Sequence, residues 1–190
     1  ALVHELNVKK PETIEFEALG IAVHGQGYAQ RDVVDDMAQH YPNPVSGMFN
    51  IGMLHTALQG RDGHAAYAPT SVEKLKSKGY EYWALGHVHT REVVNENPYI
   101  IFPGNIQGRH AKELGPKGVT LVTIENTQVE SVTEHFLDVV RWDHCRVDLS
   151  EACNESDAYN AIRQSISEAE DRAEGRLLAC RITLLGATEL

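Results

Sequence analysis

The stretch that most constrains the fold runs from Tyr82 to His89 and reads Tyr-Trp-Ala-Leu-Gly-His-Val-His. Its first four residues suit a buried β-strand, and the glycine after them indicates the end of that strand. His87 and His89 follow at positions i and i+2. In open α/β sheets, ligands bind in the crevice outside the carboxyl ends of the strands. The stretch therefore predicts a central strand that delivers two imidazoles to a place where a metal ion can be held.

A second stretch repeats this pattern, because the largely apolar run Phe49–Leu54 is followed directly by His55. The segment between the two stretches is long enough to connect parallel strands and contains a short helix. Thr70 to Glu73 reads as a capping box with Thr70 as the N-cap, and Gly79 suits the position after the helix. We therefore expect His55 to lie beside His87 and His89. From the residues alone, a metal site and a group of structural histidines are equally favoured.

Length and composition restrict the class of protein. The 190 residues suffice for one domain, or for a domain with a small appendage. A net charge of −10 does not favour gripping nucleic acid by lysine and arginine alone, although bound divalent cations would reverse the local sign. Three cysteines without C-x-x-C spacing support neither a disulfide framework nor a thiolate zinc site, and they predict a cytoplasmic setting. No apolar run reaches the roughly 20 residues of a membrane span.

Before the first histidine motif, we expect strands at residues 13–16 and 21–24, and a helix from Arg31 to His40 that is stopped by prolines. Asp32, Asp35 and Asp36 would form the solvated face of this helix. His24 ends a strand and could be a ligand, but we interpret it as a half-buried structural histidine.

Two further segments could carry function. Asp62-Gly63-His64 has the letters of a metal motif, but it lies among glycines in a loop and does not follow a strand, so we interpret it as surface loop. Residues 103–110 form a polar, glycine-rich loop that either is a plain connection or binds phosphate, with Arg109 as the fork-shaped donor.

The rest of the chain predicts mostly strands. We expect strands at residues 92–94 and 99–102, a β-hairpin from 119–124 and 129–137, and a βαβ unit made of a strand at 145–149, a helix at 155–172 and a strand at 177–185. The fold class is therefore α/β, or α+β.

Three motifs in this order, Asn50–Thr56, Gly86–His89 and Phe102–His110, make the chain resemble the calcineurin-like metallophosphoesterases. Within them it resembles the SbcD-like branch, the bacterial DNA double-strand-break repair exonucleases. The resemblance extends from about Ile14 to Trp142.

This resemblance implies a four-layer α/β/β/α sandwich over residues 1–140, followed at 141–190 by the start of a small capping domain. It implies a two-metal phosphodiesterase, usually with Mn²⁺, in which His55, His87 and His89 are ligands. Asn105, Gln107, Arg109 and His110 would contact the substrate. The implied partners are DNA, a coiled-coil ATPase subunit and a second copy of the chain, with no membrane.

The chain departs from the family at its amino-terminal motifs. It lacks an Asp-x-His after a strand, the Gly-Asp that supplies a bridging carboxylate, and the Gly-Asn-His whose histidine assists the leaving group. Two dications about 3.5 to 4 Å apart repel each other unless an anion lies between them. We therefore expect this chain to be the carboxyl-terminal part of a nuclease and to be inactive by itself, with the catalytic groups upstream. A phosphoesterase for small substrates and a non-catalytic interaction module are the alternatives.

Overall fold

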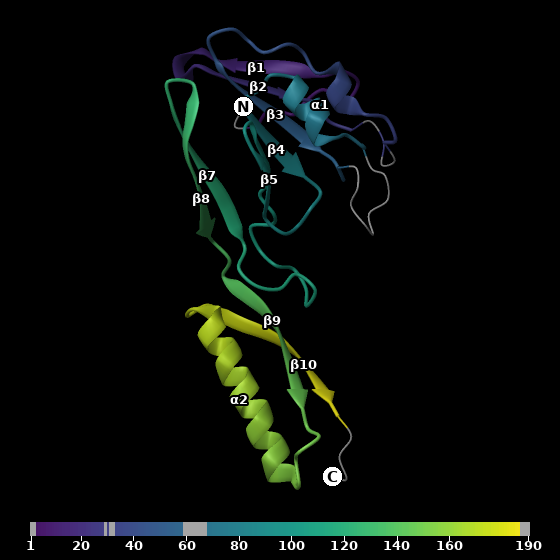
Figure 1. Cartoon of the computed structure of the whole chain (residues 1–190), viewed down its shortest axis with the longest axis vertical. Coiled ribbons are helices and arrows are strands. Elements are labelled where there is room, and N and C mark those ends of the chain that lie inside the picture. Colours follow the sequence, from purple (N-terminus) through teal and green to yellow (C-terminus); the bar gives the residue numbers. More distant parts are fainter. Residues whose placement is uncertain (1–2, 29, 31–32, 59–67, 187–190) are drawn as a thin grey trace. The chain divides into compact units, whose positions relative to one another are not determined.

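The computed structural model describes residues 3–28, 30, 33–58 and 68–186. The chain divides into two compact units (Figure 1). The first unit contains Ala1–Gly104 and Thr120–Glu134, and the second contains Asn105–Val119 and His135–Leu190. Asp62-Gly63-His64, interpreted above as surface loop, lies outside the described residues.

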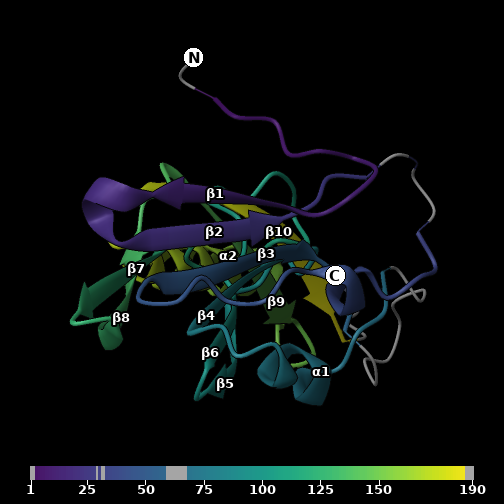
Figure 2. The same cartoon turned by 90° about the horizontal axis from the view of Figure 1, so that it is seen from above.

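A six-stranded sheet forms the first unit, and Figure 2 shows its strands side by side. The order across the sheet is β1-β2-β3-β4-β6-β5. The central strands β2, β3, β4 and β6 are parallel, whereas β1 and β5 pair antiparallel at the two edges. The bounds are β1 Glu12–Phe16, β2 Ile21–Gly25, β3 Phe49–His55, β4 Tyr82–Gly86, β5 Glu92–Glu96 and β6 Tyr99–Phe102. All six expected strands are confirmed, including the parallel pairing of the two that precede histidines.

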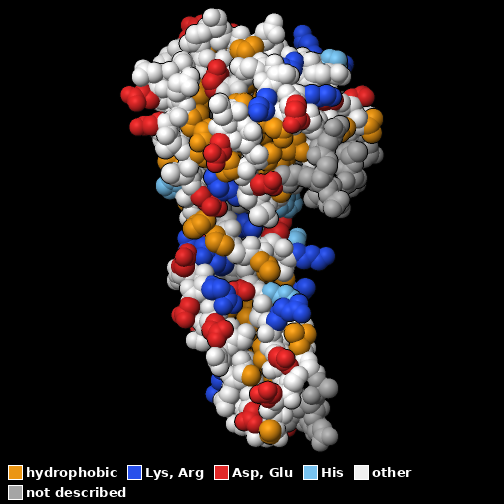
Figure 3. Space-filling model, viewed as in Figure 1, with side chains coloured by type: hydrophobic (Ala, Val, Ile, Leu, Met, Phe, Trp, Pro, Cys, Tyr) orange, Lys and Arg blue, Asp and Glu red, His pale blue; other side chains and the backbone are white. Residues whose placement is uncertain are grey.

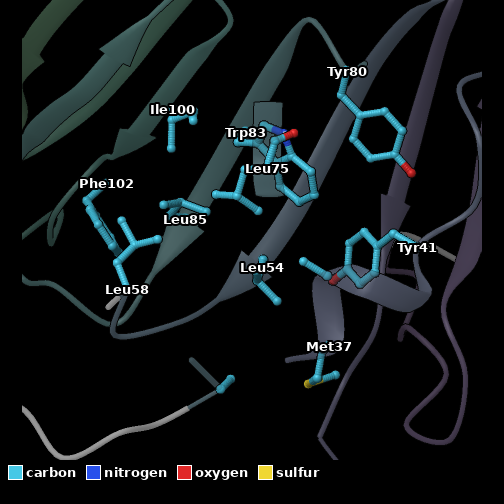
Figure 4. Packing of buried hydrophobic residues seen from close by; sticks show 12 residues of the cluster. Met37, Tyr41, Leu54, Leu58, Leu75, Tyr80, Trp83, Leu85, Ile100 and Phe102 are labelled. Carbon is cyan, nitrogen blue, oxygen red and sulfur yellow. The ribbon is translucent and has the colours of Figure 1, made fainter. Parts of the chain in front are cut away.

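Alternating residues of these strands build two cores, one on each face of the sheet. Trp83, Leu85 and Ile100 belong to the first core, which is covered by the 3₁₀ helix η2 (Met37–His40) and helix α1 (Val72–Ser77). Figure 4 shows how this first core packs. The second core holds Phe49, Tyr82 and Ile101 and is covered by a β-hairpin. Both faces are buried, which explains why these strands are continuously apolar.

The hairpin consists of β7 (Gly118–Glu125) and β8 (Gln128–Phe136). Its residues Val122, Ile124, Val129 and Val132 pack against the second core. Asn126 and Thr127 between the strands both have positive φ, of 49° and 59°, as a tight two-residue hairpin turn requires. The expected hairpin is confirmed.

The helix expected from Arg31 to His40 is wrong. Among the described residues of this range, only Met37–His40 is helical, as η2, and residues 33–36 are irregular, while Arg31 and Asp32 lie outside the described residues. The Asp36 side chain accepts a hydrogen bond from the Ala38 amide and thereby caps η2, and it also pairs with Lys74 at 2.7 Å. Asp36 was expected on the solvated face of a longer helix. Its carboxylate instead marks the amino-terminal end of η2 and links η2 to α1.

The expected N-cap of α1 is also wrong by one residue. Ser71, and not Thr70, caps the helix, because the Ser71 hydroxyl accepts from the Lys74 amide at 3.3 Å. Thr70 is completely buried, and among the described residues its Oγ1 has no hydrogen-bond partner. Gly79 follows the helix with φ of +74°, as expected.

Replacing Ser71 and Thr70 in separate variants tests which of the two residues caps α1. Ser71→Ala is expected to lower the free energy of unfolding by about 1 kcal/mol, because it removes a cap. Thr70→Val replaces an unsatisfied buried hydroxyl by a methyl group of similar shape, so the free energy of unfolding should stay equal or rise by up to about 1 kcal/mol. Urea denaturation of both variants measures the difference; a larger loss in Thr70→Val would restore Thr70 as the cap.

In the second unit, β9 (Val140–Asp148) and β10 (Leu177–Leu185) are paired in parallel and connected by helix α2 (Glu155–Ala173). Strand β9 begins earlier than expected, because Gln107 binds the backbone of Val139 and Val140 at its start. Asn154 caps α2 by accepting from the Asp157 amide. The expected βαβ unit is confirmed.

The chain therefore has the expected mixed α/β class, with more strand than helix. None of the described helices combines the length and the apolar character that crossing a membrane requires.

Candidate metal centre

His55 and His87 come together at the carboxyl edge of the sheet. His55 is the last residue of β3 and pairs with Gly86, the last residue of β4, so His87 follows beside it. The Nε2 atom of His55 lies 3.3 Å from the Nδ1 atom of His87, and the two rings are nearly perpendicular. The expected neighbourhood of these two side chains is therefore found in the structure.

Local backbone features explain this approach. A Cβ atom at Gly86 would lie 2.9 Å from Nδ1 of His55, so any larger residue there would displace the ring. His87 has φ of +109°, which a non-glycine residue rarely adopts. Strain of this kind persists only where surrounding structure enforces it, and it is frequent at functional sites.

His89 lies in the same loop, and its charge acts on His55. Partial loss of water and repulsion from His89 both lower the pKa of His55. A lowered pKa keeps the imidazole neutral near pH 7, and neutral imidazole is the form that binds metals. Gly104 packs against the backbone of residues 89–91, in the loop that carries His89. The distance is so short that there is no room for a side chain at position 104.

Sequence reasoning missed Tyr28, which supports His55 from the loop after the neighbouring strand β2. Its hydroxyl donates to the backbone carbonyl of His55, and its ring meets the imidazole edge-on at 5.7 Å between centroids. Tyr28 follows the glycine-rich turn after β2. Its position beyond the carboxyl end of a parallel strand is the signal that could have revealed it.

The ring nitrogens of His55 and His87 are spaced as two of the four ligands of a tetrahedral metal ion would be. Two nitrogens about 2.05 Å from a tetrahedral zinc ion lie about 3.3 Å apart, the separation found between His55 and His87. The same separation also allows one imidazole to donate a hydrogen bond to the other. Throughout the described ranges, no three His, Cys, Asp or Glu side chains are grouped as a ready ligand set. The described residues thus provide two converging imidazoles with a third nearby, without a carboxylate that could bridge two ions.

His24 takes no part in this centre. It is fully buried, not half-buried as expected, and stacks on Tyr80 with 4.3 Å between ring centroids. Asn50 Oδ1 accepts from Nε2 at 3.0 Å, and the Thr13 hydroxyl lies 2.8 Å from Nδ1. The Asn50 amide nitrogen faces two carbonyls, which identifies Oδ1 as the acceptor and Nε2 of His24 as the donor. Its structural role is confirmed.

Burial of His24 predicts a pH-dependent stability. Burial lowers its pKa below the ordinary 6.5, so between that lower value and 6.5 the unfolded chain binds more protons than the folded one. Stability should therefore fall as the pH drops below about 6.5, by at most about 1.4 kcal/mol per pH unit for this group. Urea denaturation of wild type and His24→Gln at pH 7.5 and 5.5 measures it. The stability gap between the two proteins should narrow at pH 5.5; an unchanged gap would contradict the assignment.

The four residues expected to bind substrate lie in the second unit. Three of them gather around the buried carboxylate of Glu113: Asn105 donates to it at 3.2 Å, the Arg109 backbone and guanidinium donate at 2.8 and 3.2 Å, and His110 lies 3.7 Å away. Gln107 instead binds the backbone at the start of β9, with its amide nitrogen 2.7 Å from the Val140 carbonyl. The Arg109 side chain is 62% exposed while its guanidinium pairs with Glu113.

Two comparisons show which known proteins the chain is similar to. Residues 142–190 match the protein-family model described as the middle domain of metallophosphoesterase YhaO. The chain is 35% identical over 188 residues to the uncharacterized metallophosphoesterase YhaO of Bacillus subtilis (strain 168). The alignment covers 97% of the chain and 45% of that relative, so the chain spans about half the length of the protein it matches. These similarities relate the chain to about half of a metallophosphoesterase and its last 49 residues to that protein's middle domain.

Proposed function

We propose that the chain is part of a metal-dependent phosphodiesterase that hydrolyses DNA as a longer protein containing this chain. His55, His87 and His89 would bind divalent cations, with two Mn²⁺ ions as the expected complement. One observation carries the proposal: two histidines from neighbouring parallel strands place their ring nitrogens 3.3 Å apart at the carboxyl edge of the sheet.

In such a site, bound cations polarise the phosphodiester and lower the pKa of a coordinated water. The residues of this chain supply neutral nitrogen donors and hold them in place. The lowered pKa of His55 keeps that imidazole unprotonated at neutral pH. Gly86 leaves space for its ring, and the Tyr28 hydroxyl fixes the backbone carbonyl behind it. Such support keeps ligands oriented before a metal arrives.

DNA as substrate follows from the family resemblance and from the exposed guanidinium of Arg109. A small phosphodiester is the second candidate, favoured by the net charge of −10. On the face shown in Figure 3, basic and acidic side chains interleave and do not form one basic field. Binding a long polyanion by charge alone requires clustered lysines and arginines, so DNA binding would depend on the cations.

An assay of the longer protein separates these candidates. With Mn²⁺ present, linear double-stranded DNA and a chromogenic phosphodiester are offered in parallel, with a chelator as control. We expect both to be hydrolysed and the chelator to stop both reactions. Hydrolysis of the chromogenic substrate alone would favour the small-substrate enzyme. Failure of both substrates would contradict the proposal and favour an interaction module.

A further inference from the structure

A cavity of about 470 Å³ lies in the first unit, beyond the carboxyl end of β2. Its described lining comes from two parts of the chain, residues 8–11 and a stretch between residues 26 and 40 that includes Gln30 and His40. Its volume falls in the range of about 300 to 1,000 Å³ that is usual for sites of small ligands and cofactors. The carboxyl ends of parallel strands are also where such sites occur in open α/β sheets.

Two glycines allow the amino-terminal segment to form one wall of the cavity. A Cβ atom at Gly25 would lie 2.6 Å from the Leu6 side chain, and one at Gly27 would lie 3.0 Å from the Leu6 carbonyl. The Gly27 amide donates to the Asn7 carbonyl at 2.9 Å. The Asn7 side chain in turn accepts from the amides of Lys9 and Lys10, at 2.8 and 3.2 Å. This backbone arrangement fixes the turn that brings the two lysines to the cavity.

The cavity combines an apolar wall with positive charge. Val8, Val33, Val34 and Met37 supply apolar side chains, and Val34 remains 72% exposed. Among the described lining residues, Lys9 and Lys10 supply two positive charges and Asp35 one carboxylate. An apolar wall beside a cationic pair suits a ligand with one flat apolar part and one anionic part.

Tyr28 connects this cavity to the candidate metal centre. It lines the cavity, and it also donates to the His55 carbonyl and meets the His55 ring edge-on. A ligand held in the cavity therefore lies one side chain away from His55. Aromatic rings such as that of Tyr28 are common stacking surfaces for nucleobases.

We propose that this cavity binds one nucleotide unit as a nucleoside 5′-monophosphate, with the base against Tyr28 and the valines and the phosphate at Lys9 and Lys10. This inference rests on the proposed function, because it interprets the bound nucleotide as one unit of the DNA substrate next to His55. The binding itself requires no metal, so it can be measured separately.

The experiment titrates the chain with deoxyadenosine 5′-monophosphate by calorimetry in the presence of EDTA. Deoxyadenosine and inorganic phosphate are titrated in the same way. Saturable binding of the nucleotide is expected, at least about tenfold tighter than that of either part alone, because the base and the phosphate each contribute. Phosphate that binds as tightly as the nucleotide would overturn the proposal, since the lysines would then form a plain anion site.

Paired variants test the location. Lys9→Ala with Lys10→Ala should weaken nucleotide binding about tenfold or more, whereas Lys112→Ala, an exposed lysine of the second unit, should leave it unchanged. Val34→Asp should also weaken it by placing a carboxylate on the apolar wall. Leu19→Asp is its matched control, because Leu19 is 70% exposed and does not line the cavity.

No saturable binding, or binding that survives both cavity variants, would overturn the proposal. A separate Mn²⁺ titration of His55→Ala without EDTA reports on the metal centre alone. Nucleotide binding in EDTA together with unaltered Mn²⁺ binding in His55→Ala would support the cavity and refute the proposed metal ligand. Absence of nucleotide binding in EDTA, together with weakened Mn²⁺ binding in His55→Ala, would refute the cavity as a nucleotide site and leave the metal centre supported.

Discussion

Replacing His87 by alanine in the longer protein is expected to reduce the Mn²⁺-dependent hydrolysis of DNA by at least about a hundredfold. His87 provides one of two ring nitrogens that lie 3.3 Å apart, and alanine removes that donor without filling its place. The rate is measured on linear DNA with Mn²⁺ in excess. Calorimetric titration of the 190-residue chain should show Mn²⁺ or Zn²⁺ binding that weakens in the same variant.

His4→Ala is the control for this result. His4 is exposed and pairs with Glu12 of β1 at 3.0 Å, so its loss removes an imidazole that a carboxylate of the edge strand holds. This variant should keep the wild-type rate and metal affinity. Circular dichroism of both variants checks the fold. Activity retained in His87→Ala with an unchanged fold would reject His87 as a ligand. Metal affinity that is unchanged by loss of His55 and by loss of His87 would indicate that these histidines are vestigial.

The Gly52→Ala variant is expected to lose about 3 kcal/mol or more of its free energy of unfolding. Gly52 pairs with Trp83 across β3 and β4, and a Cβ atom at Gly52 would lie 2.4 Å from the indole ring. The indole has no room to retreat, since Trp83 is completely buried and donates to the Leu75 carbonyl at 3.1 Å. Overpacking of a core typically costs about 1 to 3 kcal/mol, and a rigid ring places this site at the upper end. Urea denaturation followed by near-UV circular dichroism measures the loss.

Gly20→Ala separates this clash from the general effect of removing a glycine. Gly20 has φ of +64° with open space around its missing Cβ, so alanine there should cost about 1 kcal/mol through backbone strain alone. Combining Gly52→Ala with Trp83→Leu should cost clearly less than the sum of the two single changes, because the smaller side chain relieves the clash. Equal losses in Gly52→Ala and Gly20→Ala, or simple additivity in the double variant, would show that the contact is not limiting.

The strands and the first two histidines could be predicted because their signals are local. Alternation and continuous apolar runs identify β3 and β4, and a histidine directly after each strand must lie at the same edge once the strands are parallel. The βαβ unit was equally predictable, since the apolar spacing of α2 and the run from Leu177 to Leu185 leave little choice.

The errors occurred where neighbouring residues offer the same local chemistry. Thr70 and Ser71 can both cap a helix, and burial of Thr70 decided between them. The spacing of Val33, Val34 and Met37 is compatible with a helix, but the Asp36 carboxylate caps η2 and pairs with Lys74 from α1. Contacts between segments distant in sequence outweighed local preference in both cases.

The sequence by itself determined most of the strands of the sheet and the edge at which His55 and His87 emerge, because each follows from the order of residues along one strand or loop. Only the tertiary structure decided that His24 is a buried neutral side chain, that Tyr28 supports His55, and that Lys9 and Lys10 border a cavity beside it. These features depend on which segments pack together. Such packing is set by steric fit and burial across the whole first unit, and no local pattern encodes it.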